Sequence, residues 1–391
     1  MVYISAADTT YLWVARPDDA VMLSLPLGAN ALEEAILDLR EGLDPTGMET
    51  IDDIPLYDTE LAHELFLKLF APARPWLEGV RHIFVVPDGA LQSLPPSVLV
   101  TGKPKEAPNR FANYRDIPWL VHKYAFSILP SVSSLWALRD LAKGSRASKP
   151  FLGIGDPLLE GPPGASRSVK PGNLFASRGL ADADAIRTLL APLPESADEL
   201  LMLAQSMSVG RKSLMLREAA TERAVRATDL SSYKVIAFAT HGLIAGDLQG
   251  LSEPALVLTP PKSGSAEDDG LLTAGEVAQL KLDADLVILS ACNTAAADGT
   301  PGAEGLSGLA KAFFYAGARS LLVSHWPVVS DAAVKITTQM LKRTQTSGVG
   351  RAEAHRLAML AVINDKEYPI YAHPLFWSPF VVVGEGGLIQ K

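Results

Sequence analysis

Hydrophobic and polar residues alternate along the chain in two patterns. Apolar residues at helical spacing predict amphipathic helices, and short continuous runs of Val, Ile, Leu and Phe predict strands that are buried in a parallel sheet. In the amino-terminal part, these patterns predict strands at residues 2–4, 10–15, 21–25, 81–87 and 122–129, and helices at 29–41, 58–70 and 131–142, with Asp58 and Ser131 as N-caps.

A polar, basic segment rich in small residues, KGSRASKP at 143–150, predicts a domain boundary, so we expect one domain at 1–145 and a second at 150–391. Beyond it, strands alternate with helices, which predicts an α/β fold with a mainly parallel sheet flanked by helices. The expected strands are 151–155, 213–218, two strands that end in His241 and Cys292, 319–325 and 376–384. The expected helices are 180–190, 196–205, 221–228 (capped by Thr221), 273–280, 304–316, 331–344 and 350–363, and 156–179 is a loop.

Two of the buried runs end in reactive side chains. VIAFATHG at 235–242 contains His241, and LVILSACNT at 286–294 contains Cys292, the single cysteine of the chain. The carboxyl ends of strands in an α/β sheet are where loops present side chains to a cleft. A histidine about 50 residues before a cysteine is the order and interval of one known peptidase arrangement, and here the interval is 51 residues.

The chemistry of such a pair is acyl transfer. A thiol is a weak nucleophile while it is protonated, at an unperturbed pKa of about 8.5, and a neighbouring histidine can accept the proton. The N–H groups of Gly242 and Cys292 could stabilise the oxyanion that forms. The alternative for each residue is structural, because a cysteine at the end of an apolar strand is usually a small buried hydrophobe and a lone histidine is usually part of the packing.

Composition narrows the function classes. The formal net charge is −9 and no run of Lys and Arg with interleaved aromatics occurs, which argues against direct binding of nucleic acid or of an anionic membrane. One cysteine excludes an intrachain disulfide, and neither a signal peptide nor a membrane-spanning run is present, so we expect a cytoplasmic protein. The histidines show no metal-ligand spacing, so no metal or other cofactor is expected.

Blocks along most of the chain together resemble the CHAT family, caspase-like cysteine peptidases of clan CD that are related to separase and often joined to tetratricopeptide repeats. The blocks are VRHIFVVPDGALQSLP, FSILPS, FLGIGDP, YKVIAFATHG, PALVLTP, LLTAGEV, ADLVILSACNT, AEGLSGLAKAFFYAGARSLLVSHWPV and HPLFWSPFVVVG. The resemblance implies a caspase-like α/β fold and a cysteine endopeptidase with His241 and Cys292 as its dyad. It also implies that residues 1–145 form an inactive caspase-like or regulatory half beside the catalytic domain at 150–391.

The resemblance further implies a protein or peptide substrate, activation by a partner, and a role in bacterial defence or cell death. No repeat region occurs in this sequence, so the sensing or substrate-docking module is missing, belongs to a part of the protein outside this sequence, or is supplied in trans by a sensor or repeat-containing activator. Relatives that cut after Arg or Lys often have an acid two residues before the nucleophile, where this chain has Ser290. A non-catalytic interaction module and another acyl-transfer enzyme are the alternatives.

Four residues are candidates for a substrate pocket: Ser290, Asp331, Trp326 and Asp156. Asp331 follows SHWPVVS, a segment that resembles one in separase where an acid lines the pocket, but Asp331 is also a candidate helix N-cap. Trp326 could line a pocket or belong to the core. Asp156 could face the cleft or form part of a Gly-Asp-Pro turn.

Overall fold

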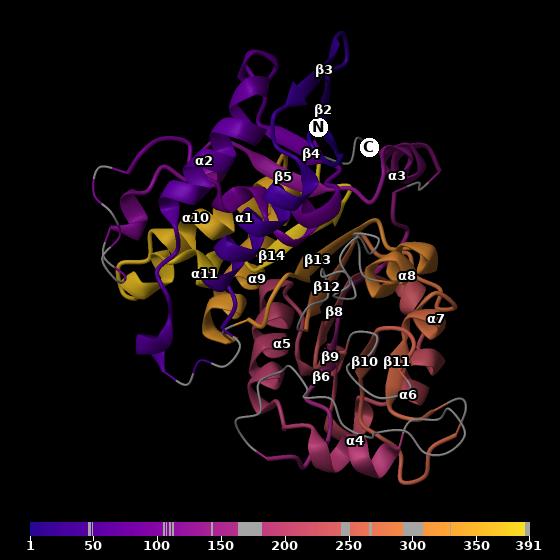
Figure 1. Ribbon diagram of the computed structural model, residues 1–391. Helices are drawn as coiled ribbons and strands as arrows, with labels where there is room; N and C mark the ends of the chain where they lie inside the picture. The colour runs from indigo at the N-terminus through magenta and orange to yellow at the C-terminus, as the bar shows by residue number, and fades with distance from the viewer. Residues whose placement is uncertain are drawn as a thin grey trace. The chain divides into compact units, whose positions relative to one another are not determined.

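The computed structural model describes residues 1–45, 48, 50–104, 106, 108, 111, 113–141, 144–162, 182–243, 251–265, 268–291, 308–328 and 330–387 (Figure 1). The chain divides into two compact units, the first with residues 1–141 and the segment that starts at Lys335, the second with the described residues from 144 to 334. The change of unit after residue 141 lies near the expected boundary. The C-terminal segment belongs to the first unit, whereas the sequence pattern groups it with the second.

The first unit contains an antiparallel sheet and three parallel strands. In the antiparallel sheet, β2 lies between β1 and β3, and in the parallel set β5 lies between β4 and β14. Helix α10 packs against β5 and β14. The elements are β1 (Val2–Ser5), β2 (Thr10–Ala15), β3 (Ala20–Leu25), α1 (Ala29–Glu41), α2 (Thr59–Leu69), β4 (His82–Val85), β5 (Ala125–Ile128), α3 (Val132–Trp136), α10 (Arg351–Ile363), α11 (Pro374–Trp377) and β14 (Phe380–Gly384).

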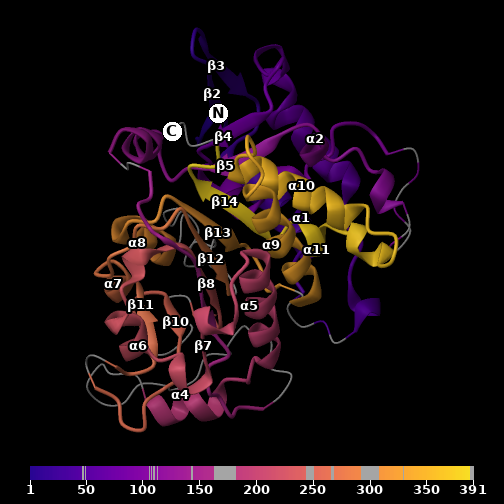
Figure 2. The same ribbon diagram turned by 180° about the vertical axis from the view of Figure 1, so that it is seen from behind.

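The second unit is built on five parallel strands in the order β13-β12-β8-β6-β7. Helix α5 packs against β6 and β8 on one face, and α8 packs against β13 on the other (Figures 1 and 2). The elements are β6 (Lys149–Gly155), α4 (Ala183–Leu189), α5 (Pro194–Ser206), β7 (Leu214–Leu216), α6 (Glu222–Ala227), β8 (Tyr233–Ala239), β12 (Leu286–Ser290), α8 (Gly308–Ala316) and β13 (Ser320–Ser324).

A small antiparallel sheet in the order β11-β10-β9 adjoins the end of β8 in the chain. Its strands are β9 (Gly242–Leu243), β10 (Ala255–Val257) and β11 (Leu271–Thr273), followed by α7 (Ala274–Val277). Helix α9 (Ser330–Thr344) follows β13. The predicted α/β class, with mainly parallel strands flanked by helices, is confirmed.

Caps set the starts of several helices, and a proline shifts the start of one expected strand. The side chains of Asp58, Ser131 and Thr221 accept backbone N–H groups at the starts of α2, α3 and α6, as predicted. The strand expected at 376–384 begins only at Phe380. Pro374 occupies the first turn of a short helix, α11, in which the Leu375 N–H donates to the His373 side chain.

Candidate functional site

Three neighbouring parallel strands of the second unit end at the same level. Gly155 on β6 pairs with Ala239 on β8, and Ala239 pairs with Ser290 on β12. The residues that follow each of these strands therefore lie at the same edge of the sheet. Asp156 follows the paired residue of β6 directly, and His241 comes two residues after that of β8. This edge is the carboxyl edge, where α/β folds place their sites.

The imidazole of His241 is buried and held in one orientation. Its side chain belongs to a residue that is 1% exposed, and its Nε2 lies 2.8 Å from the carbonyl oxygen of Ala191. A carbonyl oxygen can only accept a hydrogen bond, so Nε2 carries the proton that is donated. In the neutral ring the lone pair then lies on Nδ1. The Ala191 carbonyl thus selects Nδ1 as the ring nitrogen that can take up a proton.

The backbone around His241 is fixed by β10. The N–H of Val257 donates to the His241 carbonyl at 3.0 Å, and the hydroxyl of Thr240 donates to the Val257 carbonyl. Hydrogen-bonded and non-hydrogen-bonded pairs alternate in an antiparallel ladder, so Gly242, which pairs with Leu256, occupies a non-hydrogen-bonded position. Its N–H therefore faces away from β10.

Cys292 lies outside the described residues, which end on this side at Ala291. Ser290 is the last residue of β12 and is 1% exposed. The carbonyl of Ala291 accepts a hydrogen bond from the hydroxyl of Ser324, at the end of β13, at 2.6 Å. The backbone that leads to Cys292 is therefore held from the neighbouring strand.

Asp156 forms an unusual pair with Arg217 at the ends of β6 and β7. Both residues have positive φ, +47° and +53°, which is rare for residues other than glycine. The Arg217 N–H donates to the Asp156 carbonyl at 2.9 Å, and Nη1 of Arg217 lies 3.6 Å from Oδ2 of Asp156. Burial raises the pKa of Asp156, and Arg217 opposes that shift. Backbone strain of this kind concentrates at functional sites.

The other two pocket candidates differ in exposure. Trp326 is fully buried two residues after β13, whereas Asp331 is exposed in the first turn of α9. Because α9 begins at Ser330, Asp331 is not the N-cap that the sequence offered as an alternative. The register thus gathers Asp156, His241, Ser290 and Trp326 at one edge of the second unit, and Asp331 lies farther along the chain.

Three groups around this edge are absent from the sequence prediction. The Ala191 carbonyl is a backbone group, so no residue type marks it. Thr240 and Ser324 carry a signal, because each is a hydroxyl residue that directly follows a buried apolar run, where a buried donor must find an acceptor.

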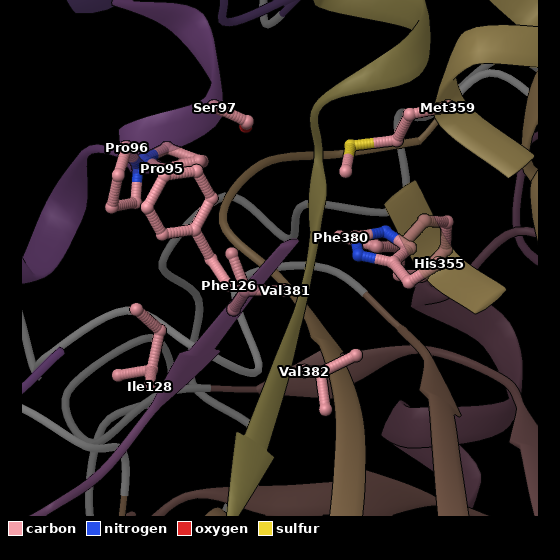
Figure 3. A pocket seen from close by; sticks show the side chains of 10 residues that line it. All are labelled: Pro95, Pro96, Ser97, Phe126, Ile128, His355, Met359, Phe380, Val381 and Val382. Atoms are coloured by element: carbon pink, nitrogen blue, oxygen red, sulfur yellow. The ribbon is translucent and has the colours of Figure 1, made fainter. Parts of the chain in front are cut away.

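A pocket in the first unit contains none of the predicted site residues. It lies between β5, β14 and α10, and Figure 3 shows His355 and Met359 of α10 on one side and Phe126 and the paired prolines 95 and 96 on the other. Nε2 of His355 is buried and has no hydrogen-bond partner among the described residues. Burial lowers the pKa of His355 to about 4, so the ring is neutral at pH 7.

Among the described residues, no three His, Cys, Asp or Glu side chains are grouped as metal ligands. The helices within the described ranges include none with the length and hydropathy needed to cross a membrane.

Comparison with known proteins identifies the family. A family model of the CHAT domain matches residues 59–385. The chain belongs to the CHAT-domain family. It is 28% identical to tetratricopeptide repeat protein 28 of the mouse (Mus musculus) over 257 residues, which are 58% of this chain. It is 27% identical to the human (Homo sapiens) protein of the same name over 338 residues, which are 78% of this chain. It spans about a tenth of the length of either relative, 10% and 12%.

Among solved structures, the CHAT domain is similar to the complex of the pro- and mature domains of RgpB from Porphyromonas gingivalis, with 9% identity, a TM-score of 0.43, and coverage of 93% of this chain and 77% of that one. The separase–securin complex of Saccharomyces cerevisiae matches with 11% identity, a TM-score of 0.41, and coverage of 95% of this chain and 21% of that one.

Proposed function

We propose that this CHAT domain is a cysteine endopeptidase in which Cys292 is the nucleophile and His241 is the general base. The observation that carries the proposal is the hydrogen bond between Nε2 of His241 and the Ala191 carbonyl. This bond leaves Nδ1 as the basic nitrogen of the ring. His241 lies at the carboxyl edge of the sheet, where β12 ends at Ser290, two residues before Cys292 in the sequence.

In the proposed reaction, Nδ1 of His241 takes the proton of the Cys292 thiol, and the thiolate adds to the carbonyl carbon of the scissile peptide. The carbonyl electron pair moves to oxygen, and the N–H groups of Gly242 and Cys292 donate to that oxyanion. The C–N bond then breaks, the leaving nitrogen takes the proton from Nδ1, and a thioester remains.

Hydrolysis completes the cycle. Nδ1 removes a proton from water, the hydroxide adds to the thioester carbon, and the C–S bond breaks. A carboxylic acid leaves, and the thiolate recovers its proton from the imidazolium. These steps use only groups of the chain and one water molecule, with no metal or organic cofactor.

The substrate in this proposal is a protein or peptide whose side chain is accepted near Asp156, Ser290, Trp326 and Asp331. Asp331 is exposed and is thus available for contact, and Asp156 already has a guanidinium partner in Arg217. We further propose that the protein is bacterial and cytoplasmic, acts in defence or cell death, and is switched on by a sensor or repeat-containing partner. The repeats named in the curated relatives support a partner of that kind.

The test is acylation of Cys292 by an activated ester such as p-nitrophenyl acetate, followed by cleavage of a peptide library. We expect His241→Gln to slow acylation by about 10²–10³-fold, because the general base is lost, and Cys292→Ala to abolish both reactions. His82→Gln is the matched control in the first unit, where Nε2 of His82 bonds the Ser127 hydroxyl at 2.8 Å. Equal acylation in the unmodified chain and His241→Gln would favour a non-catalytic interaction module. Acylation without any water-derived carboxyl terminus in the peptides would favour another acyl transfer.

A further inference from the structure

The pocket of the first unit is small and almost entirely apolar. It lies between strands β5 and β14 and helix α10, and its volume of about 10 Å³ matches a single water-sized ligand. Ser97 and His355 are the two polar residues of its lining, and the rest are prolines, phenylalanines, Met359 and aliphatic residues. None of the lining residues carries a carboxylate. The pocket therefore suits a ligand of the size of one atom or ion.

Two side chains of α10 enter this pocket from consecutive turns of the helix. Residues i and i+4 lie on the same face of a helix, so His355 and Met359 are neighbours. Figure 3 shows both side chains reaching from α10 toward β14. Each residue is 3% exposed, and Nε2 of His355 has no hydrogen-bond partner among the described residues. Because buried polar atoms in folded proteins nearly always have a partner, this nitrogen points to a ligand.

A water molecule is a poor match for the two groups. Buried waters typically make about three hydrogen bonds, and the thioether sulfur of Met359 is only a weak acceptor. Ser97, beside the prolines in Figure 3, supplies the other polar side chain of the lining. The side chains of the pocket thus satisfy a water molecule incompletely.

A soft metal ion matches the two groups better. Mg²⁺ and Ca²⁺ require several oxygen ligands, and a structural Zn²⁺ requires four ligands, commonly thiolates and imidazoles. Here the neighbouring groups are one imidazole nitrogen and one thioether sulfur. Thioether sulfur selects Cu(I), and imidazole is a copper ligand as well. Cu(I) carries a single positive charge, so it brings the least charge of these ions into an apolar site.

We propose that His355 and Met359 form a two-coordinate site for Cu(I), with Nε2 and Sδ as its ligands. The site belongs to the first unit alone and is independent of the proposed peptidase reaction. It accounts together for the open buried nitrogen, the methionine one turn farther along α10 and the ion-sized pocket. Because the pocket exists only in the folded chain, Cu(I) should also raise the thermal stability of the protein.

The test is a competition for Cu(I) between the chain and bicinchoninate in the absence of oxygen. The single thiol of the chain is itself a soft ligand, so every measurement uses the Cys292→Ala chain. His82→Gln and Met202→Leu are the matched controls. Nε2 of His82 already bonds the Ser127 hydroxyl at 2.8 Å, and Met202 is 46% exposed on α5.

We expect the Cys292→Ala chain to retain one Cu(I) per molecule, with one nitrogen and one sulfur neighbour in its X-ray absorption spectrum. His355→Leu and Met359→Leu should each weaken binding by at least about 100-fold, because losing a ligand costs more than the roughly 10–100-fold loss that follows removal of a supporting group. The sulfur neighbour should disappear in Met359→Leu, and both controls should bind as before. The spectrum needs no change in the pocket, so it tests the ligands even if His355→Leu does not fold.

Three outcomes would overturn the inference. One is that the chain retains no Cu(I) against bicinchoninate, which would leave the pocket to water. Another is equal retention in His355→Leu, Met359→Leu and the two controls, which would show that other groups bind the ion. The last is a spectrum of bound Cu(I) without a sulfur neighbour. None of these outcomes bears on the acylation of Cys292, so the proposed function is tested separately.

Discussion

Both units end their parallel strands in polar residues, but they use those residues differently. In the first unit, Asp88 after β4 accepts the Ser5 N–H at 2.7 Å, and Glu385 after β14 pairs with Arg139 at 2.7 Å. These contacts tie one segment of the unit to another. In the second unit, the Ala191 carbonyl and the Ser324 hydroxyl instead orient groups next to the candidate dyad. A sheet edge becomes a candidate site when its polar contacts orient a reactive group, and the presence of polar residues alone is not enough.

The pKa values of the buried histidines in the first unit and of a buried carboxyl group in the second shift in opposite directions. Burial lowers the pKa values of His82 and His355 to about 4 and that of His373 to about 3, all in the first unit. In the second unit, burial raises the pKa of Glu222 to about 8. The neutral form is favoured in each case because a charge loses its hydration when buried. These histidines should therefore make the first unit lose stability as the pH falls below 6.5, and Glu222 should make the second lose stability as the pH rises through 8.

Glu222 should give the largest effect on stability. Its folded pKa of about 8 lies above the ordinary value of 4.5, because burial and the nearby Glu276 outweigh Arg226, whose Nε lies 2.8 Å from Oε1. The folded state thus binds the proton more tightly, so the contribution is complete below pH 4.5 and is lost as pH rises through 8. One pKa unit is 1.36 kcal/mol, so the loss is roughly 5 kcal/mol.

Glu222→Gln keeps the shape and removes the titration. Urea unfolding between pH 5 and 9 should show a flatter free energy of unfolding for this variant, which becomes the more stable chain above pH 8. Glu218→Gln, at an exposed position on the preceding turn, is the control and should keep the original slope. An unchanged dependence of the free energy of unfolding on pH in Glu222→Gln would show that Glu222 does not cause the loss of stability in alkali, and would contradict the contrast between the two units.

The residues that could be predicted from sequence are those whose effect is local. Asp58, Ser131 and Thr221 cap the helices that directly follow them, and a cap depends only on the next few N–H groups. Helix α1, Ala29–Glu41, matches its predicted range because its apolar spacing and the following Gly42 lie within the helix itself or at its end.

The groups that orient the candidate site act over a distance along the chain. The Ala191 carbonyl reaches His241 across 50 residues, and Ser324 reaches Ala291 across 33. Both contacts depend on the register of strands and on the path of a loop. Neither of these can be inferred from the spacing of apolar residues along the chain. The short strand β11, Leu271–Thr273, was missed for a related reason, because three residues are too few to show a period and its formation depends on pairing with β10.

His355 provides a test of the expected loss of stability of the first unit in acid. Its folded pKa of about 4 lies below the ordinary value of 6.5, so the unfolded chain takes up the proton first as pH falls. Its contribution is therefore complete above pH 6.5 and is lost as pH falls to 4, by about 3 kcal/mol. His355→Leu should reduce the slope of the free energy of unfolding between pH 6.5 and 4 in urea titrations. An unchanged slope would mean that the other buried histidines account for the acid sensitivity of this unit.

Loss of a helix N-cap should have the smallest effect on the free energy of unfolding, and the same kind of cap can be removed in each unit. The Asp58 carboxylate accepts the N–H groups of Glu60 and Leu61 at 3.0 and 2.9 Å in the first unit, whereas the Thr221 hydroxyl accepts only that of Ala224, at 3.1 Å, in the second. Replacing such a cap by Ala costs about 1 kcal/mol, and we expect a larger loss for Asp58→Ala than for Thr221→Ala because two donors lose their acceptor. Asp58→Asn, which can still accept both bonds, is the control.

Acylation of Cys292 should stay unchanged in all three variants, since neither cap contacts the β8 and β12 ends. A slower acylation in Thr221→Ala at full folding would instead link α6 to the candidate site and weaken the assignment of orientation to the Ala191 carbonyl and Ser324.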